Sequence, residues 1–292
     1  MTRLDDNEEE IEASRAPLMD HLLELRTRLV VCVAAFVVGF IGCFIVADPI
    51  YVFLVQPLVV ATQFHDAAGP GGSVSPFDLI LGTAGLKAIP IGDGHTVNLI
   101  FTAPLEFLIT KMKLAAFGAV VITFPVLAWQ LYRFVAPGLY RNERGAFLPF
   151  LIAAPMLFLL GAALVYYVML PFVMLFSLGQ QINNSGISAE LLPRVSDYLS
   201  LVMALLLAFG LCFQLPVVMT LLGMAGLVSS QALASGRKFA VVAIAVVAAF
   251  VTPPDPLSQI MLGIPLVLLY EVSIWCVRII EMRRKKDEAL ET

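Results

Sequence analysis

Long stretches without a charged residue constrain this chain more than any other feature. An α-helix needs about 20 apolar residues to cross the hydrocarbon core of a bilayer. The uncharged runs at 29–47 and 114–132 are suited to one crossing each, and the run at 145–189 exceeds one crossing. Apolar residues make up 60% of the chain and charged residues 14%, against about 45–50% and 25% in soluble domains. This composition excludes a soluble enzyme, a disordered chain and a nucleic-acid-binding domain, and it predicts an all-α membrane protein.

Charged residues and turn signals divide the chain into six predicted transmembrane helices. We place them at 29–47, 114–132, about 146–170, about 198–222, 239–251 and 259–277. Pro171 and the polar cluster at 180–186 end the third helix, and the Pro-rich segment 252–256 is a turn between the last two. The segment 48–112 is one long connection that is too polar for lipid.

The fifth predicted helix is short, and so is the sixth. At 1.5 Å per residue, the uncharged run of the fifth rises roughly 20 Å, well below a hydrocarbon core of about 30 Å. Either the flanking Arg237 and Lys238 snorkel and the span is longer than it looks, or the protein thins the bilayer around it. The second alternative would suit a translocation machine.

The distribution of basic residues predicts the orientation. Of the 18 Lys and Arg residues, fourteen lie in the N-terminal tail, the second-to-third connection, the fourth-to-fifth connection and the C-terminal tail. The positive-inside rule therefore places both termini in the cytoplasm, which agrees with an even number of spans. We expect a single six-helix domain at 1–278, whose residues 1–16 form an acidic, disordered tail, followed by a charged cytoplasmic tail at 279–292.

Enzymatic chemistry has no visible motif in this sequence. The four cysteines lie inside apolar runs without metal-site spacing, and the three histidines are scattered. The chain contains no nucleotide-binding loop, catalytic triad or phosphate cradle. We therefore expect no catalytic residue, no metal site and no cofactor.

Two acidic residues near the predicted cytoplasmic face are candidate functional groups. Leu22, Leu25 and Leu29 share one face of a helix that runs into the first span, and Glu24 lies on another face with Arg28. Glu24 and Arg28 could form an ordinary ion pair worth a few tenths of a kcal/mol. Similarly, Glu143 is the only acid among three arginines in the second-to-third connection, where it could form a local salt bridge.

Gln214 and Glu271 are candidates of a different kind, because they lie inside predicted spans. A charged residue at membrane depth is a functional hypothesis by default. The alternative for Gln214 is an interhelical hydrogen bond worth about 1 kcal/mol. The alternative for Glu271 is a position near the cytoplasmic headgroups, since Arg278 follows it closely.

Four strings along the chain resemble the TatC family, the multi-spanning receptor subunit of the twin-arginine protein translocase. They are residues 21–29 (HLLELRTRL), 134–144 (FVAPGLYRNER), 197–204 with 209–216 (DYLSLVMA and FGLCFQLP), and 252–259 (TPPDPLSQ). The resemblance extends from about residue 17 to residue 278. It implies a concave six-helix bundle, with both termini cytoplasmic, in the bacterial inner membrane.

The resemblance also implies a function and partners. Such proteins bind the twin-arginine signal peptides of folded cargo at the cytoplasmic face. They assemble with single-span subunits of the TatA and TatB type and with other copies of themselves, and the complex exports folded proteins using the proton-motive force. Lipid surrounds the bundle, and no nucleic acid is involved.

The family's receptor site corresponds to Glu24 and Glu143 in this sequence. A guanidinium pairs with a carboxylate through a planar two-bond fork, which agrees with that role. The full set of residues that we assign to signal-peptide binding is Glu24, Arg26, Phe134, Leu139, Tyr140, Glu143 and Arg144. The residues that we assign to docking of single-span partners are Pro57, Thr252, Asp255 and Gln259.

Two departures from the family pattern stand out. Gln214 occupies a position where the family commonly has a glutamate, so a titratable group is missing there while a polar contact is kept. The outer connection is also longer than usual around residues 77–95. A transporter or channel for a small solute is the competing function, although the chain shows no internal repeat. An intramembrane enzyme is a third alternative, for which no nucleophile–base pair is visible.

Overall fold

The structure is a computed structural model that describes residues 3–69, 74–88, 99–135, 148–184, 187–189, 193–251 and 256–291. Its helices are α1 (Arg3–Ile45), α2 (Ala47–Ala68), α3 (Pro76–Thr83), α4 (Glu106–Val135), α5 (Leu148–Leu164), α6 (Leu170–Leu178), α7 (Val195–Cys212), α8 (Leu215–Met224), α9 (Ser230–Ser235), α10 (Arg237–Val251) and α11 (Pro256–Glu291). A π-helical turn, η3 (Val165–Met169), joins α5 to α6. Strands β1 (Ile182–Asn184) and β2 (Ile187–Ala189) form a short antiparallel hairpin.

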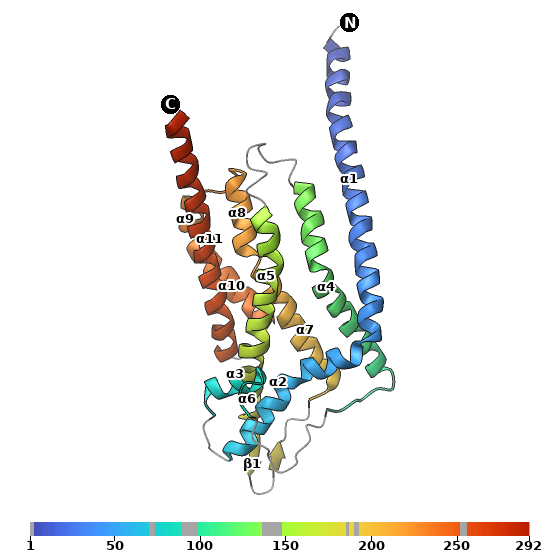
Figure 1. Cartoon of the computed structure of the whole chain (residues 1–292), viewed down its shortest axis with the longest axis vertical. Coiled ribbons are helices and arrows are strands. Elements are labelled where there is room, and N and C mark those ends of the chain that lie inside the picture. Colours follow the sequence, from blue (N-terminus) through green and yellow to red (C-terminus); the bar gives the residue numbers. More distant parts are fainter. Residues whose placement is uncertain are drawn as a thin grey trace.

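The long helices form a bundle whose two ends differ (Figure 1). The first residues of α1 and the last residues of α11 project from the same end, which we call the termini end. Helices α2 and α3 and the β1–β2 hairpin lie at the opposite end, which we call the hairpin end. Both ends of the chain therefore lie on one side of the bundle, as an even number of crossings requires.

The structure confirms an all-α protein with six apolar segments of sufficient length, but their positions partly differ from the prediction. The six are Leu22–Ile45, Ala47–Ala68, Glu106–Phe134, Leu151–Leu178, Val195–Met224 and Gln259–Arg283. This set includes α2, which lies in the segment expected to be a polar connection, and it omits the 15-residue α10. Asp48 and His65 near the two ends of α2, and Pro57 in its middle, concealed an apolar helix of 22 residues.

Helix α2 does not return to the termini end. Figure 1 shows it turning away from the end of α1 and lying obliquely across the hairpin end, from which α4 then rises. The segments that run between the two ends are therefore α1, α4, α5 with α6, α7 with α8, α10 and α11. Helix α10 is the short fifth predicted helix, and at roughly 22 Å it is shorter than a typical hydrocarbon core.

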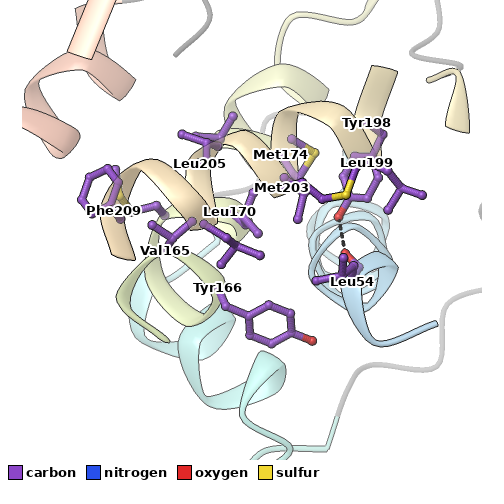
Figure 2. Close-up of a cluster of buried hydrophobic side chains, with 14 of the residues drawn as sticks. Leu54, Val165, Tyr166, Leu170, Met174, Tyr198, Leu199, Met203, Leu205 and Phe209 are labelled. Carbon is purple, nitrogen blue, oxygen red and sulfur yellow. Dashed lines mark hydrogen bonds between the residues drawn. The ribbon is translucent and has the colours of Figure 1, made fainter. Parts of the chain in front are cut away.

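Two tyrosine hydroxyls anchor α2 to the bundle. Pro57 has no N–H, so the carbonyl oxygen of Phe53, four residues earlier, has no helical donor. The Tyr166 hydroxyl donates to this oxygen at 2.7 Å, and the Tyr166 ring stacks on the Phe53 ring with centroids 4.3 Å apart. The Tyr198 hydroxyl donates to the Leu54 carbonyl oxygen at 2.9 Å, as Figure 2 shows.

Tyr166→Phe is expected to lower the free energy of unfolding by about 1 kcal/mol, because it leaves the Phe53 carbonyl without a donor. The matched control is Tyr167→Phe, since the Tyr167 hydroxyl makes no hydrogen bond within the described residues. Unfolding of the purified variants in mixed detergent measures both. Equal stabilities for the two variants would contradict this role for Tyr166.

The main core lies where η3, α6 and α7 meet α2. Figure 2 shows side chains from these elements pointing toward one another, among them Leu54, Val165, Leu170, Leu199 and Leu205. Each of these five is at most 2% exposed. The core is thus nearer to the hairpin end, and it fixes α2 against the crossing helices.

The third crossing is longer than predicted, because Pro171 does not end it. In η3 the Leu170 N–H donates to the Val165 carbonyl, five residues back, and α6 then continues to Leu178. A proline is tolerated in the first turn of a helix, where its missing N–H would have no partner. Because α6 starts anew after the π-helical turn, Pro171 lies in the first turn of α6 although it is inside the membrane span.

Helix α1 begins at Arg3, whereas residues 1–16 were expected to be a disordered tail. The segment is rich in glutamate, which favours helix formation, and acidic residues are stabilising near a helix N-terminus. The helix of the apolar segment Leu22–Ile45 therefore extends toward the N-terminus as far as Arg3.

Candidate functional site

Glu24 lies on α1 near the termini end and pairs with Arg28 one turn later. The Arg28 Nε donates to Glu24 Oε1 at 3.1 Å, and Nη2 donates to the same oxygen. The Glu24 side chain remains 36% exposed. The ordinary ion pair considered from the sequence is therefore present, and the paired carboxylate is partly exposed.

The packing of α1 against α4 places Glu24 level with the last turn of α4. A Cβ on Gly118 would lie 2.9 Å from Cys43 Sγ, and one on Gly39 would lie 3.4 Å from Ala119 Cα, so the two helices are closely packed and antiparallel. Both helices rise about 1.5 Å per residue. Counting from these contacts toward the termini end, Glu24 comes to about the height at which α4 ends.

The remaining candidates for signal-peptide binding divide into two groups. Arg26 is exposed on α1, and Phe134 is half-buried in the last turn of α4. Nearby, the Arg133 guanidinium lies 5.9 Å from the Trp129 ring centroid. Leu139, Tyr140, Glu143 and Arg144 lie outside the described residues. The structure thus places Glu24 level with the end of α4, and the position of Glu143 relative to Glu24 stays a prediction.

Gln214 makes the interhelical hydrogen bond considered from the sequence. It lies between α7 and α8, and its Nε2 donates to the Ala154 carbonyl oxygen on α5 at 2.9 Å. The same nitrogen lies 3.5 Å from the Gly210 carbonyl oxygen. The Gln214 backbone N–H donates to Leu211, so this side chain supplies a donor to the Gly210 carbonyl at the helix break. The amide therefore has a structural role at this position.

Glu271 forms a two-bond fork with the first residue of α10. Arg237 Nε and Glu271 Oε1 are 2.8 Å apart, and Arg237 Nη2 donates to Oε2 at 2.8 Å. At the preceding position of α11, the Tyr270 hydroxyl donates to the Leu233 carbonyl oxygen of α9 at 2.8 Å. Glu271 thus lies beside the basic start of α10, which favours its interpretation as a residue near the headgroups.

A groove of about 430 Å³ lies between α10 and α11. Apart from the Gln259 side chain, its lining is apolar, and it consists of Val241, Ile244, Ala245, Ile260, Gly263, Ile264, Val267 and Leu268. The Gln259 Nε2 donates across the groove to the Ala245 carbonyl oxygen at 3.1 Å. The groove follows directly on the predicted docking segment around residues 252–259.

The other predicted docking residues do not line this groove in the described structure. Thr252 and Asp255 lie outside the described residues. Pro57 is buried in α2, where it faces the protein. Its observed role is to free the carbonyl that Tyr166 binds, and a docking role for Pro57 stays a prediction.

Sequence reasoning missed one polar cluster at the hairpin end. Glu106 Oε2 accepts from the Thr102 N–H at 2.7 Å and the Ala103 N–H at 3.1 Å, and Glu106 Oε1 accepts from the Ser196 hydroxyl at 2.5 Å. The cluster ties the start of α4 to the start of α7. Its sequence signal is a threonine four residues before a glutamate at a helix start, which is similar to a capping box.

Comparison with known proteins identifies the family. The family model described as "Sec-independent protein translocase protein (TatC)" matches residues 20–265. The chain belongs to the TatC family. The resemblance found in the four sequence strings is thereby confirmed.

Individual relatives match this TatC-family chain over nearly its whole length. The "Sec-independent protein translocase protein TatC" of Magnetococcus marinus is 40% identical over 277 residues, which cover 95% of this chain and 89% of the relative. The protein TatCy of Bacillus subtilis is 32% identical and matches over 96% of both chains. A solved structure described as "Crystal Structure of Twin Arginine Translocase Receptor- TatC" superposes with a TM-score of 0.68 at 31% identity, covering 89% of this chain and 98% of that one.

Membership of this family determines what kind of protein this is. It is a component of a protein translocase, and it is a multi-pass protein of a bacterial membrane. Its role is protein transport rather than enzymatic catalysis. Within the part of the chain that the structure describes, no group of three or more His, Cys, Asp or Glu residues could hold a metal ion.

Proposed function

We propose that this protein is the signal-peptide receptor and core subunit of a twin-arginine translocase. It lies in the bacterial inner membrane with its termini end facing the cytoplasm. At that end it binds the twin-arginine signal peptides of folded cargo. It then assembles with other copies and with single-span subunits of the TatA and TatB type. The complex exports folded proteins using the proton-motive force.

The observation that carries this proposal is the position of Glu24. Its carboxylate is partly exposed, and it lies level with the end of α4, which Glu143 follows by eight residues in the sequence. We infer that Glu24 and Glu143 together pair with the two adjacent guanidinium groups of the signal peptide. The solved relative described as a twin-arginine translocase receptor supports the same assignment.

The location of the site suits the chemistry. A binding site at the membrane surface avoids the cost of burying four charges in lipid. Each guanidinium can form two parallel hydrogen bonds with a carboxylate, whereas a lysine ammonium cannot reproduce this fork. Arg26, Phe134, Leu139, Tyr140 and Arg144 complete the proposed site, with the apolar members beside the apolar stretch of the signal peptide.

Photocrosslinking to a synthetic twin-arginine signal peptide tests the receptor role. Photoreactive side chains at Leu23 and Asn142, which flank the two carboxylates, are expected to crosslink to the peptide. A probe at Phe101, which is exposed and precedes the hairpin-end start of α4 by five residues, is the control and should not react. A peptide with two lysines in place of the arginines should fail to crosslink at either site. Equal crosslinking of the two peptides would contradict the proposal.

The groove between α10 and α11 is the proposed docking site for a single-span partner helix. The groove is apolar and faces outward, and the short α10 leaves polar groups close to the lipid boundary where a partner could contact them. Gln259 lines the groove, and we assign Thr252 and Asp255, which precede it in the sequence, to the same docking interaction. The proposal therefore places the partner along α10 and the first half of α11.

Gly263→Phe is expected to remove most of the single-span partner that copurifies with the protein, because the new ring fills the groove. A Cβ on Gly263 meets nothing within 4 Å, so the substitution should not disturb the fold. Gly42→Phe is the matched control, because a Cβ on Gly42 of α1 also meets nothing. Partner recovery from detergent extracts measures the effect. An undiminished recovery with Gly263→Phe would exclude this groove as the docking site.

A further inference from the structure

The two basic residues that begin α10 have different partners. Arg237 is held by Glu271 through two bonds of 2.8 Å, so its charge is neutralised within the protein. The adjacent Lys238 is exposed, and it makes no ion pair with the described residues. Lys238 therefore carries a positive charge at this end of α10 that no acidic side chain among the described residues neutralises.

Lys238 lies on the face of α10 that lines the groove. It precedes Val241 and Ala245 by three and seven residues, and both of these line the groove. On α11, Trp275 follows the lining residue Leu268 by seven residues, so it also continues the groove face. Trp275 is 65% exposed. Since Arg237 pairs with Glu271, one turn before Trp275, the lysine and the indole flank the same mouth of the groove.

We propose that this groove binds one phospholipid with an anionic headgroup. An acyl chain lies along the apolar lining, the phosphate contacts Lys238, and the Trp275 indole lies at the level of the headgroup. Basic positions between transmembrane helices recognise anionic headgroups, and tryptophan is favoured at the membrane–water interface. The Gln259 amide nitrogen donates to Ala245, so the wall facing the acyl chain is effectively apolar.

The charge at the mouth selects an anionic lipid over a zwitterionic one. A zwitterionic headgroup would bring its own cation next to Lys238, whereas an anionic headgroup brings only the phosphate and neutral groups. Because Glu271 is occupied by Arg237, it does not offer a site for a headgroup cation. The inference goes beyond the proposed docking function: a partner helix would have to displace this lipid from the groove.

Native mass spectrometry of the purified full chain tests the proposal, with phosphatidylglycerol and phosphatidylcholine of identical acyl chains as probes. We expect one phosphatidylglycerol to be retained with a preference of roughly fivefold, the ratio that about 1 kcal/mol per basic residue gives. Lys238→Gln is expected to abolish the preference. Arg133→Gln, which removes one charge at the same end of the bundle but away from the groove, should keep it.

Gly263→Phe separates the groove from the headgroup contact. It is expected to reduce retention of both lipids, while Lys238→Gln affects only the difference between them. A preference that survives Lys238→Gln, or retention that survives Gly263→Phe in a protein of unchanged thermal stability, would overturn the proposal. Partner recovery and signal-peptide crosslinking are measured on the same preparations. A failed lipid preference with intact crosslinking and partner recovery would therefore leave the proposed function standing.

Discussion

Replacing Glu24 with glutamine is expected to weaken binding of a twin-arginine signal peptide by roughly 10- to 100-fold, because the charge-assisted pair with a guanidinium is lost. Glutamine keeps the shape of the side chain and its hydrogen-bonding capacity, so the change isolates the charge. Glu143→Gln is expected to have a similar effect, and Glu143→Asp a smaller one. Binding of a fluorescent signal peptide to the purified, normally accumulating variants measures the affinities.

Arg28→Gln is the control that separates the two roles of Glu24. In the structure, Arg28 donates twice to Glu24 Oε1. If Glu24 served only this pair, Glu24→Gln and Arg28→Gln would be equivalent, and each would cost about 0.3–0.5 kcal/mol of helix stability. If Glu24 is a receptor residue, the Arg28→Gln variant should instead bind the signal peptide at least as tightly as the unsubstituted protein. Equal losses of affinity in the two variants would reject the receptor role.

The crossing helices could be predicted from sequence because charged residues mark the ends of apolar runs. The method failed at α2, where the run is interrupted by Pro57 and bordered by Asp48 and His65. Helicity there depends on tertiary contacts, in particular the Tyr166 hydroxyl that satisfies the Phe53 carbonyl. No pattern within residues 47–68 indicates that a hydroxyl more than one hundred positions away in the sequence will donate a hydrogen bond to the Phe53 carbonyl.

The interactions of the candidate residues also divide into those that the sequence could predict and those that it could not. The sequence allowed the Glu24–Arg28 pair, because the two residues are four apart on a helix. The Arg237–Glu271 fork and the Gln214–Ala154 bond join residues that are far apart in sequence, so only the fold could assign these partners. Glu106 was missed because it was read as part of a polar connection rather than as the start of a helix.

Gly161→Ala is expected to destabilise the protein by about 2 kcal/mol, because α5 and α7 are too close for a methyl group at this position. A Cβ on Gly161 would lie 2.8 Å from the Phe209 carbonyl oxygen and 2.8 Å from the Phe213 ring. Gly42→Ala is the matched control, since nothing lies within 4 Å of its Cβ position. There, alanine should stabilise α1 by up to about 1 kcal/mol through its higher helix propensity. Unfolding in mixed detergent micelles should therefore show opposite signs for the two substitutions.

Gly210, a second glycine where α5 crosses α7, tests whether backbone atoms or side chains limit how closely these two helices can approach. A Cβ on Gly210 would lie 2.5 Å from the Phe158 ring, which is itself stacked on Phe124 with centroids 4.2 Å apart. In lipid, where apolar burial does not favour one helix partner over the acyl chains, such close approach is a main source of helix association. Phe158→Leu should partly rescue Gly210→Ala, because a smaller side chain relieves that clash. It should not rescue Gly161→Ala, whose clash includes a backbone oxygen. Rescue of both glycine variants by Phe158→Leu would show that the crossing is less tightly constrained than its geometry implies.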